Sequence, residues 1–335
     1  MFHSSRCKNA DLLASSQILY DCFRHNREEM VQLANNHIQA VQTWLSTRTP
    51  YAKRFLGKGV IANSSGLPVP LLNLAFGTDY APGTSDELIE REIESVKTFY
   101  QYQSVPWSWW IAPNATPSDM IQRLKDHGLV CNFRRPVMVA PLPFHSHSYK
   151  SDIHVSHATS THDLKIASTI RRRSFGFPEG VAENYFEAMA ENWLSRKRGT
   201  LYMAGLAGEA PSAIGALITG AGLPGIYMMA TLPERRRYGL GSAILKHILM
   251  QATQQQYKFI VLTASPLGYP LYSKFGFVHV FDYLGFGEAN NSFKKPTERR
   301  QRVESDYLGT DRRSTIMVNE TRQTHMPAYA LNSFR

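Results

Sequence analysis

Cysteine is scarce in this chain of 335 residues. The three cysteines, Cys7, Cys22 and Cys131, lie far apart and form no C-x-x-C pair. An odd number of cysteines at such spacing excludes a disulfide framework and a cysteine-based zinc knuckle. We therefore expect a protein of a reducing compartment.

Long apolar runs are missing as well. The polar N-terminus, Met1 to Arg6, leads into no apolar segment, and no stretch approaches the length of a membrane span. We expect a soluble, cytoplasmic protein with no membrane partner, while export by a route that uses no such signal stays open. Hydrophobic residues still make up 43% of the chain, which excludes a mostly disordered protein. The length predicts two domains.

Acidic residues are outnumbered, because 37 Lys and Arg face 27 Asp and Glu, for a net charge of +10. Such a surplus suits anionic ligands, whether nucleic acid, a membrane surface or a polyphosphate cofactor. Clusters at 171–173, 196–198, 235–237 and in the C-terminal tail carry much of it. We expect solvated surfaces at the first two clusters and in the tail. The third cluster differs because it adjoins a glycine turn.

A polar segment at 143–152 predicts a linker between two halves. Histidines in and after it, at 145, 147, 154 and 157, match no zinc spacing, so we expect no metal. Beyond the linker, apolar periodicity predicts alternating strands and helices. The strands are expected at 152–157, 200–207, 213–220, 226–232, 259–263 and 277–281, and the helices at 163–173, 181–194, 240–255 and 266–274. This order predicts a mixed α/β sheet.

The turn between the strand at 226–232 and the helix at 240–255 has the sequence Arg236-Arg237-Tyr238-Gly239-Leu240-Gly241-Ser242. A strand, a glycine turn and a helix start together form an anion site, since backbone N–H groups point outward and the helix dipole adds partial positive charge. The two glycines let the main chain approach a bulky phosphate. The turn therefore predicts a phosphorylated ligand.

This turn, together with Leu271-Tyr272-Ser273-Lys274-Phe275-Gly276-Phe277 about thirty residues later, resembles the GCN5-related N-acetyltransferase (GNAT) family. The first motif is similar to the family's pyrophosphate turn, Q/R-x-x-G-x-G/A, and the second is similar to the end of its last helix. The resemblance covers residues 152 to about 286. It implies a mixed, mostly antiparallel, splayed sheet flanked by helices, and acetyl-CoA or another acyl-CoA as the co-substrate, with no metal.

The resemblance also implies the site residues. Backbone groups on the strand edge would pair with the pantetheine, the turn would hold the pyrophosphate, and a serine would stand where many relatives have a cofactor-contacting asparagine. These cofactor-binding residues are Met229, Ala230, Thr231, Arg236, Arg237, Tyr238, Gly239, Leu240, Gly241, Ser242 and Ser265. Tyr272 matches the tyrosine near the CoA sulfur and is the candidate general acid. The alternative for Tyr272 is a helix residue that packs on the sheet.

A general base is harder to identify. Some relatives carry a glutamate on the strand before the turn, where this chain has Tyr227 and Met228. Glu179, Glu183 and Glu187 are weak candidates, and a water chain could serve instead.

The first half repeats part of this pattern. Strand-like runs at 68–76, 107–111 and 137–142 alternate with helices at 86–102 and 117–127, and Gly128-Leu129 stands where Gly276-Phe277 stands later. Its turn at 77–83 is acidic and lacks the glycine motif, and Leu124 lies in the region that matches Tyr272. We interpret residues 1–145 as a degenerate GNAT-like domain, 152–286 as a catalytic domain and 287–335 as a disordered basic tail; a plain structural domain is the alternative for the first half.

The leading functional hypothesis is an acyl-CoA-dependent N-acetyltransferase that acts on an amine, whether a small molecule or a protein. A catalytically weak acetyl-CoA-binding sensor or interaction protein is the alternative. A nucleic-acid-binding protein is a weaker alternative, since the basic tail carries no motif that recognises DNA or RNA. The identity of the acceptor and the oligomeric state stay open.

Overall fold

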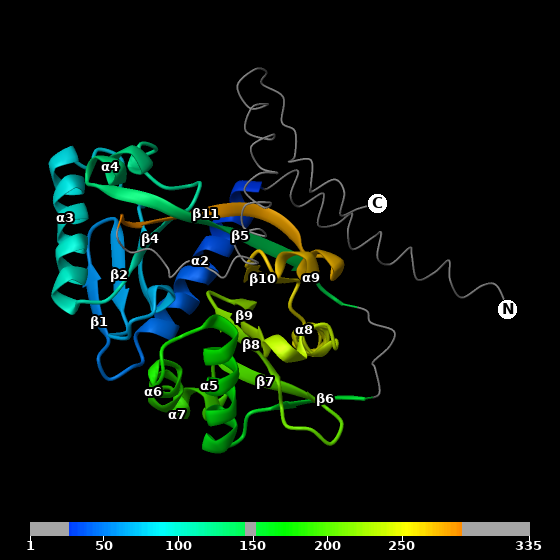
Figure 1. Cartoon of the computed structure of the whole chain (residues 1–335). Coiled ribbons are helices and arrows are strands. Elements are labelled where there is room, and N and C mark those ends of the chain that lie inside the picture. The colour runs from blue at the N-terminus through cyan, green and yellow to red at the C-terminus, as the bar shows by residue number, and fades with distance from the viewer. Residues whose placement is uncertain (1–26, 145–151, 290–335) are drawn as a thin grey trace, which may run out of the picture.

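The computed structural model describes residues 27–144 and 152–289. The first 26 residues, the histidines at 145 and 147, and the predicted tail beyond residue 289 lie outside this part. The described chain builds one 11-stranded sheet in the order β1-β2-β3-β4-β11-β5-β10-β9-β8-β7-β6, with helices on its faces (Figure 1). Most neighbouring strands are antiparallel, so the predicted mixed α/β class and splayed, helix-flanked sheet are confirmed.

Residues 27–144, the described part of the first half, contain three helices, a short 3-10 turn and five strands. They are α2 Arg27–Ser46, β1 Lys53–Leu56, β2 Val60–Ser64, η1 Pro70–Leu72, β3 Asn73–Gly77, α3 Asp86–Gln103, β4 Ser108–Ile111, α4 Met120–Asp126 and β5 Leu129–Pro141. The sequence interpretation did not identify α2, β1 or β2. Helix α2 is nevertheless amphipathic, because Ala34, Ile38 and Val41 are fully buried at helical spacing.

The second half follows the predicted order closely. Its elements are β6 Ile153–His157, α5 Thr161–Phe175, α6 Val181–Ala188, α7 Ala190–Ser195, β7 Gly199–Leu206, β8 Ala213–Gly220, β9 Leu223–Thr231, η2 Pro233–Arg235, α8 Leu240–Gln254, β10 Phe259–Thr263, α9 Tyr269–Lys274 and β11 Val278–Glu288. The single helix predicted at 181–194 is two helices, because Met189 leaves the helical conformation with φ −98° and ψ 5°.

The two halves repeat one topology. Each has antiparallel strands followed by a short parallel pair, β3 with β4 in the first half and β9 with β10 in the second. A helix follows each member of the pair, α3 and α4 in one half and α8 and α9 in the other. This repetition supports two related domains in tandem.

The last strands of the two halves are exchanged. Strand β11 lies between β4 and β5, and β5 lies between β11 and β10, so each half inserts its final strand into the other (Figure 1). One core cluster accordingly joins Val137 and Val139 of β5 with Val261 and Val278 of the second half. The domain limits at 145 and 152 stay a prediction, but neither half closes its own sheet.

Helix α2 also connects the halves, since it contacts β3 of its own half and β8, β9 and β10 of the other. Within the described ranges, no helix is long and apolar enough to cross a membrane.

Candidate functional site

The glycine turn has the backbone geometry of an anion cradle. Arg237 and Gly239 have left-handed backbone angles, with φ of 69° and 92°, on either side of Tyr238. Such alternation directs successive N–H groups toward one side. Gly239 is the N-cap of α8 and has no side-chain cap, so the first N–H groups of this 15-residue helix stay available at its positive end.

The arginines at the turn differ in their availability. The guanidinium of Arg235 forms an ion pair with Glu209, with 2.6 Å between Nη2 and Oε2. Arg236 and Arg237 are exposed, and Arg236 Nε donates to the Thr231 carbonyl over 3.4 Å. Positive charge near the turn therefore comes from Arg236 and Arg237, the two arginines predicted to bind cofactor.

Strands β9 and β10 separate just before the turn. They are paired at Gly225 and Ile226, whereas β9 continues beside β8 as far as Thr231. A bulge opposite Gly215, with Met228 at φ 56°, bends β9 at the point of separation. In the part of the chain that the structure describes, the backbone of Met229 to Thr231 therefore has no strand partner on the β10 side.

Gly215 makes the bend possible. A Cβ atom at this position would lie 2.4 Å from Met229 Sδ and 2.7 Å from Ile244 Cγ2, which is closer than atoms can approach. The absent side chain lets α8 and the bulged strand pack together.

Tyr272 is placed by the end of α9. Gly276 has φ 81°, Phe277 N donates to Tyr272 O over 3.2 Å and Gly276 N to Ser273 O over 3.1 Å, which is a Schellman motif. The rings of Tyr272 and Phe277 pack edge to face at 5.9 Å, as the motif favours. The local sequence of this chain therefore accounts for the conformation at the end of α9.

The Tyr272 side chain is 6% exposed, and burial raises its pKa well above the ordinary value. The hydroxyl thus stays protonated at neutral pH. Among the described residues it has no hydrogen-bond partner, which leaves its proton free for a ligand.

Ser265 has a structural role in the turn before α9. Its hydroxyl accepts from Gly268 N over 3.2 Å, and its carbonyl accepts from Gly268 and Tyr269 N–H groups. This turn delays the helix, which begins at Tyr269 rather than at the predicted Pro266. A cofactor contact through Ser265 stays a prediction.

The glutamates proposed as weak base candidates do not converge. Glu179 and Glu187 are exposed, and Glu183 forms an ion pair with Arg172 at 3.3 Å.

A buried pair that the sequence did not reveal connects α2 with β9. His37 of α2 contacts the Gly220 carbonyl through Nδ1 at 2.9 Å and the Tyr227 hydroxyl through Nε2 at 3.0 Å. Burial lowers the His37 pKa to about 4, so the ring is neutral. Because a carbonyl only accepts, Nδ1 carries the proton and Nε2 accepts from Tyr227. The strand position where some relatives carry a glutamate is therefore tied to the first half of the chain.

The basic cluster at 171–173 was predicted to be a solvated surface, and this is wrong for Arg171, which is 9% exposed. Successive residues of a helix point in different directions. Arg171 therefore lies on the inner face of α5, whereas Arg172 and Arg173 do not. The cluster at 196–198 is exposed, as expected.

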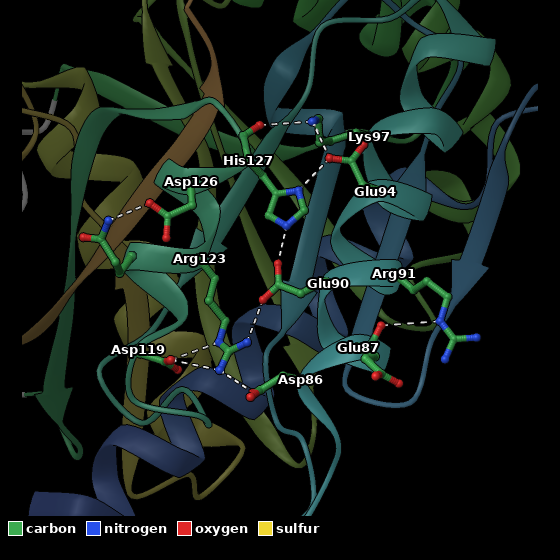
Figure 2. A network of polar contacts seen from close by, with 11 residues as sticks. Asp86, Glu87, Glu90, Arg91, Glu94, Lys97, Asp119, Arg123, Asp126 and His127 are labelled. Carbon is green, nitrogen blue, oxygen red and sulfur yellow. Dashed lines mark hydrogen bonds and ion pairs between the residues drawn. The ribbon is translucent and has the colours of Figure 1, made fainter.

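The first half has different chemistry at the matching positions. Asp86 and Glu87 stand in the first turn of α3, and Leu124 replaces the tyrosine. Figure 2 shows carboxylates of α3 around Arg123 of α4 and around His127, the C-cap residue of α4, with Arg123 2.6 Å from both Asp86 and Glu90. Negatively charged carboxylates at the start of a helix repel a phosphate group. A single cofactor site in the second half remains our prediction.

Comparison with known proteins gave matches at the level of family and fold. Residues 177–284 match the sequence model described as "Acetyltransferase (GNAT) domain". A search of curated protein sequences gave no match.

Solved structures with a similar fold include a GCN5-related N-acetyltransferase from Kribbella flavida, with a TM-score of 0.58 and 15% identity over 75% of this chain and 95% of that one. A second, from Sphaerobacter thermophilus, has a TM-score of 0.53 and 13% identity over 69% and 81% of the two chains. A tandem GNAT protein from the clavulanic acid biosynthesis pathway has a TM-score of 0.50 and 14% identity, and covers 82% of this chain and 97% of its own. At these identities the similarity establishes the fold.

Proposed function

We propose, from the premise that residues 177–284 of this chain belong to the GNAT acetyltransferase family, that the protein transfers an acetyl group from acetyl-CoA to an amine. The observation that carries the proposal is the separation of β9 from β10 directly before the anion cradle at Arg236 to Ser242. An extended ligand with amide groups at one end and phosphates at the other matches this sequence of backbone features.

The proposed ligand contacts follow from the geometry. The backbone of Met229, Ala230 and Thr231 would pair with pantetheine amides, and the N–H groups from Arg237 to Ser242 would meet the pyrophosphate. The protonated hydroxyl of Tyr272 would face the sulfur.

The proposed reaction is direct attack. The neutral amine forms a C–N bond to the thioester carbonyl, and collapse of the tetrahedral intermediate breaks the C–S bond. Tyr272 donates its proton to the departing sulfur, the nitrogen loses a proton to water, and the tyrosinate regains a proton from the solvent. Electron pairs and protons balance without a metal or a redox partner.

Calorimetric titration with acetyl-CoA tests the binding step. The double variant Gly239→Asp plus Gly241→Asp places two carboxylates in the cradle, and we expect it to abolish measurable binding. Gly83→Asp is the matched control, since Gly83 also has a left-handed φ of 83° and open space around its missing side chain. Failure of the natural sequence to bind acetyl-CoA, or equal affinities for the double variant and the natural sequence, would refute the proposal.

Thiol release from acetyl-CoA with a panel of amines tests the chemical step. A specific observation favours one other function, a sensor that binds acetyl-CoA without turnover: β9 carries Tyr227, held by His37, where a carboxylate base could stand. Binding with no release of thiol, hydrolysis included, would support the sensor over the enzyme.

A further inference from the structure

Arg171 is enclosed by aromatic side chains on the inner side of α5. Its guanidinium carbon lies 5.9 Å, 5.7 Å and 5.8 Å from the ring centres of Phe175, Phe177 and Tyr185. The side chain is 9% exposed and Tyr185 is 2% exposed. These contacts orient the cation and offset part of its desolvation cost.

The polar atoms of this pair lack partners. Arg171 Nη1 and the Tyr185 hydroxyl are both buried and without a hydrogen bond among the described residues. The two following arginines on α5 do find carboxylates, Arg172 at Glu183 and Arg173 at Glu234. Burying a cation without a counter-ion costs free energy. An anion beside Arg171 would lower this cost, and the described chain does not supply one.

The two groups line a small cavity with apolar walls. Phe177, Val181 and Ala182 of the second half form one side, and Val69 and Leu72 of the first half form the other. The pKa of Arg171 is lowered and that of Tyr185 raised, in both cases by burial.

The wall from the first half is held in place by a buried asparagine. Asn73 Nδ2 donates to the carbonyls of Leu67, Val69 and Pro106 over 2.8 Å, 3.1 Å and 2.9 Å, and its Oδ1 accepts from Ser65 N over 2.9 Å. The first half therefore supplies one wall of the cavity from a segment that these hydrogen bonds hold in place.

We infer that Arg171 and Tyr185 form a binding site for a carboxylate group and that, resting on the proposed acetylation of an amine, the acceptor is an amine that carries a carboxylate. A carboxylate accepts from a guanidinium and a phenol at once, and the guanidinium fork matches its two oxygens. Met228 and Leu232 of β9, the strand that carries the proposed thioester site, are partly buried against the core cluster that contains Tyr185.

The binding arm of the test needs no turnover. Saturation-transfer NMR with propionate and with propionamide compares the charged and neutral forms of one probe on the natural sequence, Arg171→Met and Tyr185→Phe. We expect propionate, not propionamide, to bind the natural sequence, and Arg171→Met to weaken that binding by about tenfold or more. Absence of propionate binding, or equal binding by Arg171→Met, overturns the inference.

Melting curves check that the variants fold. Arg171→Met removes an unpaired buried cation and keeps an apolar chain of similar length, so we expect a melting temperature close to that of the natural sequence. Tyr185→Phe keeps the ring and removes the hydroxyl, so it reports on the site even if Arg171→Met fails to fold.

The activity arm separates this inference from the proposed function. The ratio of kcat/KM for an ω-amino acid to that for its amide is expected to exceed about tenfold in the natural sequence and to fall toward one in Arg171→Met. Acetylation without preference for the acid overturns the carboxylate site but not the proposed acetyltransferase activity. Propionate binding with no acetyl transfer to any amine overturns the acetyltransferase and leaves the site standing.

Discussion

Removing the hydroxyl of Tyr272 is expected to slow turnover without lowering the stability of the fold or the affinity for the cofactor. The ring of Tyr272 is buried in a core cluster, while its hydroxyl has no hydrogen-bond partner among the residues that the structure describes. Tyr272→Phe keeps every ring contact, including the one with Phe277 at 5.9 Å. The free energy of unfolding is therefore expected to change by less than about 1 kcal/mol.

The effect on rate is expected to be much larger. Loss of a positioned proton donor lowers kcat by about 100-fold or more, which is about 2.7 kcal/mol in the activation free energy. The hydroxyl does not take part in the backbone cradle, so the affinity for acetyl-CoA is expected to stay within about twofold. Thiol release measures kcat, and calorimetric titration measures the affinity.

Tyr100→Phe is the matched control. Tyr100 is 1% exposed, and its hydroxyl donates to the Asn63 carbonyl over 2.9 Å in the first half of the chain. We expect this variant to lose about 1 kcal/mol of stability and to keep its kcat. If Tyr272→Phe instead loses stability like Tyr100→Phe, or loses affinity and turnover equally, Tyr272 is a packing residue and the reasoning fails.

Two further predictions concern the rest of the fold. Residues 152–335 expressed alone are expected to lack cooperative unfolding by circular dichroism, because β5 of the first half lies between β10 and β11; a cooperative transition would contradict this. Stability is also expected to depend on His127: burial lowers its pKa, but hydrogen bonds to Glu94 and Glu90 outweigh burial and raise it overall. Its stabilisation is thus complete below the unfolded pKa of about 6.5 and is lost as the pH rises through the higher folded pKa. Urea unfolding should show a larger deficit for His127→Gln at pH 6 than at pH 9, and equal deficits would refute it.

The sequence by itself determined the features with local causes. Apolar periodicity and turn glycines located the strands and helices of the second half, because burial of one face and left-handed backbone angles act within a few residues. The Schellman motif at Tyr272 to Phe277 is of this kind, and so is the cradle at Arg237 and Gly239.

Only the tertiary structure decided the features that join distant segments. The exchange of β5 and β11, the contact of His37 with Tyr227 across 190 residues, and the enclosure of Arg171 beside Leu72 follow from the packing of one half on the other. An arginine in a basic run has the same local pattern whether it lies in water or in a core. Its burial is set by which surfaces the rest of the chain brings against its helix, and no short-range rule encodes that choice.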